Sequence, residues 1–205
     1  MRVRPAIATG ALGMALLLSG CGAQDASLVP VPIPVTPTPA PPATSSTPQP
    51  TLPMPSGASV TLDPALMAIL PTSVGGVPVN QEPESFGEAV KDPSFVASID
   101  RAVFPIAVSG GDLASGVIAH VRPGVYSDKM FADWRSSYDD GACAQSSGVA
   151  AHAEQTLAGR TTYVTTCGGG LRVYHTYLAS QGVIVSVFST GVQDFGAQLM
   201  GGIRG

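Results

Sequence analysis

The sequence has little charge, and lysine in particular is scarce. Of its 205 residues 12% are charged, and Lys91 and Lys129 are the two lysines. The formal net charge of −4 leaves no basic cluster of the kind that binds nucleic-acid phosphates or anionic lipid headgroups. We therefore expect no nucleic-acid partner.

The sequence also lacks an apolar run long enough to cross a membrane comfortably, which needs about 20 residues. Residues 5–18 are uncharged and rich in Ala, Leu and Gly, and they follow Arg2 and Arg4. A short positive segment before an apolar run of this length is typical of a cleaved export signal. The run ends at Leu18-Ser19-Gly20-Cys21, where small residues precede a cysteine.

This four-residue segment resembles the lipobox of bacterial lipoprotein precursors, and the resemblance covers about the first 22 residues. It implies that residues 1–20 are a signal peptide and that Cys21 is lipidated and becomes the mature N-terminus. The protein would then be lipid-anchored on the extracytoplasmic face of the cell membrane, in an oxidising compartment. The alternatives are a secretory signal with a chance cysteine and a retained membrane helix. The preference for arginine, with abundant Ala and Gly, is typical of GC-rich genomes such as those of actinobacteria.

Residues 21–59 predict a disordered linker. Between Pro30 and Pro55, 11 of 26 residues are proline, which removes backbone donors and prevents both helix and sheet. We expect a semi-rigid polyproline II tether that reaches on the order of 100 Å, at about 3.1 Å per residue. Its interspersed Ser and Thr residues are of the kind that is sometimes O-glycosylated.

Cysteine is scarce beyond the predicted anchor. Cys143 and Cys167, 24 positions apart, are the other two cysteines. Two thiols in an exported domain predict one disulfide, which would stabilise the fold by about 3 kcal/mol in the chain-entropy model. Free buried thiols and a redox pair are the alternatives, although the sequence contains no Cys-x-x-Cys.

Residues 60–205 have the length of a single domain. Asp63-Pro64 and Asp92-Pro93 each predict a helix start, and the second helix is expected to continue through Val103. A strand is predicted over 115–122. The clearest helix begins after Ser127 and ends at Gly141.

The C-terminal third predicts a meander of about four strands, at 149–156, 161–167, 171–179 and 183–190, before a helix from about Gln193. A three-residue loop at 180–182 would place His175 and Tyr177 on the face of Val183, and a two-residue loop would shift the register. The order predicts an α+β domain with an antiparallel sheet and helices packed on one face. It is similar to small extracytoplasmic domains of bacterial lipoproteins, including PsbP-like ones.

Catalytic, metal and cofactor motifs are absent from the sequence. It has no Gly-x-Ser-x-Gly, and Cys167-Gly168-Gly169-Gly170 lacks the Lys-Ser/Thr of a phosphate loop. His152-Ala153-Glu154 matches half of a zinc-deaminase signature without its cysteine half. His120, His152 and His175 lack metal-ligand spacing, and we interpret the first and last as satisfied strand histidines. Asp139-Asp140 is interpreted as a solvated helix end, with an ion site as the alternative.

We therefore expect a non-catalytic domain that binds a small ligand or an envelope protein, with no cofactor and no metal. Any pocket is predicted between the sheet and the helix of Trp134, lined by some of Trp134, Tyr138, His175 and Tyr177. The helix's stripe of large apolar residues is also typical of core. The alternatives are an envelope hydrolase or transferase, marked by a concave cluster that brings a histidine onto a carboxylate or hydroxyl, and an accessory subunit of an envelope complex.

Overall fold

The computed structural model describes residues 58–204. The predicted signal peptide, Cys21 and the linker up to residue 57 therefore lie outside the described residues. Within 58–204, no helix is both long enough and apolar enough to cross a membrane.

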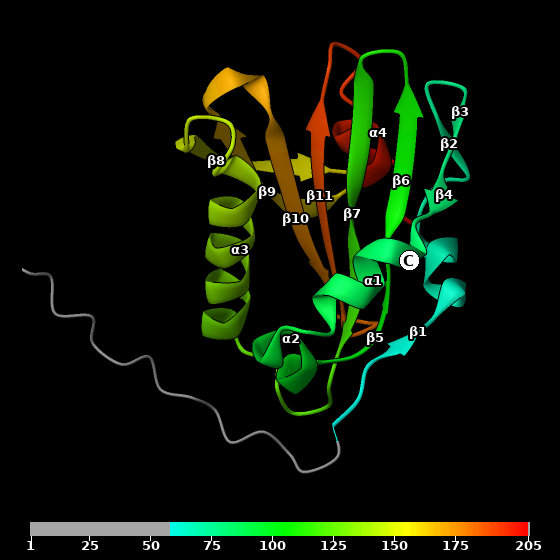
Figure 1. Cartoon of the computed structure of the whole chain (residues 1–205), viewed down its shortest axis with the longest axis vertical. Helices are drawn as coiled ribbons and strands as arrows, with labels where there is room; N and C mark the ends of the chain where they lie inside the picture. Colours follow the sequence, from blue (N-terminus) through cyan, green and yellow to red (C-terminus); the bar gives the residue numbers. More distant parts are fainter. Residues whose placement is uncertain (1–57, 205) are drawn as a thin grey trace, which may run out of the picture. The chain divides into compact units, whose positions relative to one another are not determined.

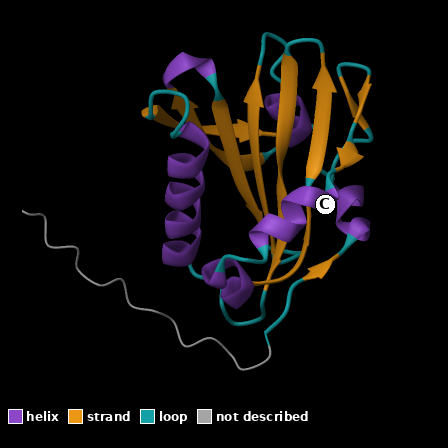
Figure 2. Ribbon diagram, in the orientation of Figure 1, coloured by secondary structure: helices purple, strands orange, loops and turns teal. Residues whose placement is uncertain are grey.

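A nine-stranded sheet forms the centre of the domain (Figures 1 and 2). The main strand order is β1-β5-β7-β11-β10-β9-β8, and β6 joins β7 to β4. The long strand β7 pairs with β11 on one side and with both β5 and β6 on the other. The strands are β1 (Thr61–Leu62), β4 (Asn80–Gln81), β5 (Ile99–Val103), β6 (Pro105–Ser109), β7 (Asp112–Val121), β8 (Val149–Leu157), β9 (Arg160–Cys167), β10 (Arg172–Leu178) and β11 (Val183–Thr190).

The remaining elements cover the two faces of this sheet. Helices α1, α2 and α3 lie on the near face in Figure 1, and α4 lies behind the sheet. Their bounds are α1 (Pro83–Ala89), α2 (Pro93–Ser98), α3 (Asp128–Cys143) and α4 (Phe195–Gly201). The small elements are the 3₁₀ helices η1 (Pro64–Ile69) and η2 (Gly168–Gly170) and the separate hairpin of β2 (Ser73–Val74) and β3 (Val77–Pro78).

The predicted α+β class and the four-strand meander β8–β9–β10–β11 are confirmed. The sheet is larger than predicted, and it is mixed because β1 pairs parallel with β5. The prediction that helices pack on one face is wrong. Strand β11 buries consecutive residues from Val183 to Val187, so both faces of the sheet need an apolar cover.

Two hydrophobic layers supply this cover. Behind the sheet, Phe195, Leu199 and Met200 of α4 are almost fully buried against residues of η1, β7 and β11. On the near face, Phe95 of α2 and Phe131 of α3 pack with residues of β5, β7 and β11. The predicted C-terminal helix is therefore confirmed, and it begins at Phe195.

Three predicted boundaries are wrong. Helix α2 ends at Ser98, and residues 99–103 form β5 instead, because their apolar spacing suits a strand buried against β7 as well as a helix. Helix α3 continues through Gly141 to Cys143. The β10–β11 loop has four residues, since Leu178 pairs with Val183, so His175 and Tyr177 share their face with Ser186 and Ile184 rather than with Val183.

The predicted disulfide joins Cys143 to Cys167, with the two Cα atoms 5.2 Å apart. Both residues are buried. The bridge connects the last residue of α3 to the last residue of β9, so it fastens the end of the helix to the sheet.

Candidate functional site

A buried polar network lies between α3 and the sheet. The Trp134 Nε1 donates to Ser186 Oγ at 2.9 Å, and this hydroxyl lies 2.8 Å from His175 Nδ1. On the other side of the ring, His175 Nε2 lies 2.9 Å from Asp139 Oδ1. His175 and Ser186 are fully buried, and Asp139 is 3% exposed. The network thus connects one helix to two adjacent strands.

The network extends from Asp139 to the surface. Thr165 Oγ1 donates to Asp139 Oδ2 at 2.6 Å and lies 2.9 Å from Nδ1 of the exposed His152 on β8. An ionised carboxylate only accepts, so His175 Nε2 donates to Asp139 and Nδ1 accepts from Ser186. With this assignment the imidazole is neutral, and both of its nitrogens have a hydrogen-bond partner.

Burial lowers the pKa of His175 and so favours this neutral form. The carboxylate of Asp139 acts in the opposite direction, and the positive charge of Arg135 adds to the lowering. We assign a neutral ring because the hydrogen bond from Ser186 needs an unprotonated Nδ1.

The order hydroxyl, imidazole, carboxylate is also that of hydrolytic triads. Here, however, Ser186 has no exposed surface, and its hydroxyl already accepts a hydrogen bond from Trp134 Nε1. The ring of Tyr138 packs edge-on against His175, with centroids 5.4 Å apart. A nucleophile must reach its substrate, so this network is suited to fixing α3 on the sheet rather than to attacking a bond.

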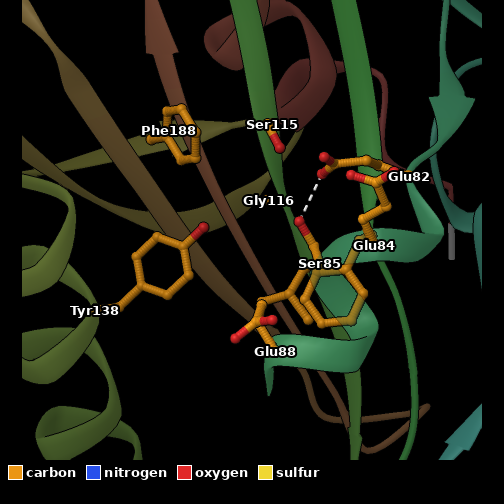
Figure 3. Close-up of a pocket in the computed structure, with 10 residues that line it drawn as sticks. Glu82, Glu84, Ser85, Glu88, Ser115, Gly116, Tyr138 and Phe188 are labelled. Carbon is orange, nitrogen blue, oxygen red and sulfur yellow. Dashed lines mark hydrogen bonds between the residues drawn. The ribbon is translucent and has the colours of Figure 1, made fainter. Parts of the chain in front are cut away.

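A groove of about 500 Å³ opens beside this network, between α1 and α3 (Figure 3). Strands β7 and β11 contribute its floor, through residues 115–117 and Phe188. Figure 3 shows the carboxylates of α1 and its N-cap on one side and the Tyr138 hydroxyl on the other. We call this site the acidic groove, and its lining residues are Glu82, Glu84, Ser85, Glu88, Phe104, Ser115, Gly116, Val117, Tyr138 and Phe188.

The electrostatics of the acidic groove are one-sided. Three glutamates line it, and among residues 58–204 no lysine, arginine or histidine contributes to the lining. Glu82 is held in place by the Ser85 hydroxyl, which donates to its Oε2. Glu88 pairs with Lys91 at 2.7 Å, but both side chains are more than two-thirds exposed, so water screens this pair.

Ser115 is the unusual polar residue of the floor. It is 8% exposed, and none of residues 58–204 forms a hydrogen bond with its hydroxyl. In Figure 3 this hydroxyl points into the groove, between Phe188 and Glu82. Among the described residues the Ser115 hydroxyl is therefore available to form a hydrogen bond with water or with a polar ligand in the groove.

An adjoining cavity of about 340 Å³ extends the groove along the C-terminal end of α3. Tyr138 and Phe188 line both cavities. The other lining residues are small or apolar, and we call this site the apolar recess: Ser137, Tyr138, Gly141, Ala142, Leu171 and Phe188. Burial raises the pKa of the Tyr138 hydroxyl, so it stays protonated, and it donates a long hydrogen bond of 3.5 Å to the backbone carbonyl of Ser186.

The four predicted pocket residues are divided between different surroundings. Tyr138 lines both cavities, whereas Trp134 and His175 belong to the buried network. Tyr177 stacks on Tyr126, with ring centroids 3.7 Å apart. The sequence reasoning missed the glutamates of 82–88, Ser115 and Phe188. The glutamates at 82, 84 and 88 are visible in the sequence, but they indicate a binding site only once the fold places α1 opposite α3.

The other candidate polar residues are also placed by the structure. His120 Nδ1 lies 2.7 Å from Asp100 Oδ1, and the predicted satisfied strand histidine is confirmed there. Asp140 is exposed as predicted, but the interpretation of Asp139 as solvated is wrong. Across residues 58–204, no group of three or more potential ligand side chains could hold a metal ion.

Comparisons with protein-family models, curated proteins and solved structures find no match to this chain.

Proposed function

We propose that this chain is a lipid-anchored domain on the extracytoplasmic face of the cell membrane, and that it binds a small ligand in the acidic groove and apolar recess. The lipobox-like segment and the proline-rich stretch support the anchor and the tether. The buried Cys143–Cys167 bridge supports an oxidising compartment, where such bonds persist.

The observation that carries the binding proposal is the pair of adjoining cavities above β7 and β11. Their volumes lie within the range of about 300–1,000 Å³ that is usual for small-molecule sites. They combine apolar walls with a few converging polar groups, which is the usual composition of such sites. A concave site of this size favours a small molecule over a flat protein partner.

A steric plug tests this proposal. Gly141 lines the recess, and a Cβ added there would meet no atom within 4 Å, so Gly141→Trp introduces a bulky side chain at the recess from a position with room for its Cβ. Gly201 of α4 offers equally open space behind the sheet, and Gly201→Trp is the matched control. The probe is the neutral dye N-phenyl-1-naphthylamine, whose fluorescence rises in apolar surroundings.

We expect the dye to bind the unaltered protein and the Gly201→Trp variant, and to bind the Gly141→Trp variant at least about tenfold more weakly. Circular dichroism of both variants checks that they fold. Equal dye binding by all three proteins would show that the recess is not the site, and the proposal would fail.

A further inference from the structure

We propose that the ligand is an organic cation with an apolar body, whose amine lies among the α1 carboxylates and whose body extends past Tyr138 into the apolar recess. This inference rests on the proposed function, because it names the class of molecule that the same site takes.

The charge at one end of the site favours a cation. Glu82 and Glu84 face the groove without an ion-pair partner among residues 58–204, and the exposed Lys91 neutralises Glu88 only in part. Since no basic side chain of the described part of the chain lines either cavity, a phosphate or carboxylate ligand would find no counter-ion there. An ammonium group would find up to three carboxylates on one wall.

Ser115 supplies the second, independent observation. Ser115 as a residue is more than nine-tenths buried, while its hydroxyl has no hydrogen-bond partner among the described residues and points towards the same end of the groove as Glu82 (Figure 3). A hydroxyl can accept a hydrogen bond from an ammonium group. The carboxylates alone would describe an acidic surface, whereas this hydroxyl adds a hydrogen-bonding group to the floor of the same groove.

The aromatic and apolar residues define the rest of the ligand. Tyr138 and Phe188 stand where the two cavities meet, so a molecule that spans both must pass these rings. Rings of this type attract a cation on their faces and also pack against an apolar chain. Beyond them, Leu171 and Ala142 offer apolar surface and no charge. The site is therefore polarised from a cation-binding end to an apolar end.

Three probes share the same phenylalkyl body and differ in the charge of the end group, so they separate the effect of charge from that of shape. They are 4-phenylbutylamine, 4-phenylbutanol and 4-phenylbutyrate. Each is titrated into the full chain labelled with ¹⁵N, and amide chemical shifts locate the site and give the affinity. We expect the amine to shift the amides of Glu84, Ser115 and Gly116, with an affinity at least about tenfold above that of the alcohol. The acid should bind most weakly.

Variants then assign the preference to residues. The double variant Glu84→Gln/Glu88→Gln should bring the amine to the affinity of the alcohol, while Glu154→Gln, on the exposed strand β8, should change nothing. Ser115→Ala should weaken the amine several-fold without lowering the thermal stability of the free protein, because it removes a hydroxyl that has no partner.

The outcomes distinguish the two proposals. If all three probes shift the groove amides with equal affinity, the groove binds ligands but the cation class is wrong. If no probe shifts these amides, both the cation class and the groove site fail. If the amine shifts amides beside Glu154 and Asp133 as much as those of the groove, it responds to surface charge only, and the inference is overturned.

Discussion

At the scale of single residues, Asp139 is the centre of the network that holds α3 on the sheet. It accepts hydrogen bonds from His175 and Thr165 while almost fully buried, and its neighbour Asp140 is exposed. Asp139→Ala should lower the free energy of unfolding by about 3 kcal/mol, because two buried donors lose their acceptor. Urea unfolding measures the loss. The matched change Asp140→Ala should stay within about 0.5 kcal/mol, and equal effects of the two would show that the network does not contribute.

His175 makes stability depend on pH in a defined direction. Its pKa in the folded state is lowered, chiefly by burial, from an unfolded value of about 6.5. Above about pH 6.5 the His175 imidazole is neutral in both the folded and the unfolded protein. As the pH falls below it, the unfolded chain binds a proton that the folded chain resists, so the free energy of unfolding should decrease, by up to about 1.4 kcal/mol per pH unit.

Urea midpoints measured between pH 7.5 and 5 test this dependence. The charges that face the ring are Asp139 and Arg135, so the comparison keeps both and changes only the imidazole. His175→Gln should flatten the slope, because it removes the buried imidazole whose pKa folding lowers. An unchanged slope in His175→Gln would assign the pH dependence to other groups.

At the scale of elements, local signals determined how much could be predicted. Asp63, Asp92 and Ser127 were recognised as N-caps, and in the structure each side chain accepts from a backbone amide in the first turn. The residues 99–103 were misassigned because a four-residue apolar spacing fits a helix and a strand equally, and only pairing with β7 decides between them.

The groove could not be predicted in the same way. It forms where α1, β7, α3 and β11 meet, and its residues range from Glu82 to Phe188. No local pattern in the chain records which of these distant segments lie together. The sequence predicts a pocket under the middle of α3, whereas in the structure Trp134 and His175 occupy this space and hydrogen-bond with Ser186.

The Cys143–Cys167 bridge is an element-scale constraint with a measurable contribution. It closes a loop between residues 24 apart and fixes the end of α3 beside the apolar recess. The double variant Cys143→Ala/Cys167→Ala should lower the free energy of unfolding by about 3 kcal/mol. Reducing agent should lower the unfolding midpoint of the parent protein and leave that of the double variant unchanged. A midpoint insensitive to reductant in both would argue that the bridge is absent in solution.

At the scale of the whole molecule, the anchor is the remaining prediction, and it depends on Cys21, which lies outside the described residues. The intact mass of protein extracted from its native membrane should correspond to a chain that starts at Cys21 and carries a diacylglyceryl group. Two further thiols should react only after reduction, because Cys143 and Cys167 are joined.

A variant separates the anchor from the fold. Cys21→Ala should move the protein from the membrane fraction to the soluble fraction, since a lipid chain is the proposed attachment. The Cys143→Ala/Cys167→Ala variant should remain in the membrane fraction, because it removes two cysteines from the folded domain and leaves Cys21 in place. A parent mass that still includes residues 1–20, or a parent protein found unlipidated in the soluble fraction, would overturn the anchor. The cellular compartment of the protein would then have to be determined anew. The predictions for Asp139, His175 and Ser115 would stand unchanged, because they concern the folded domain and not the anchor.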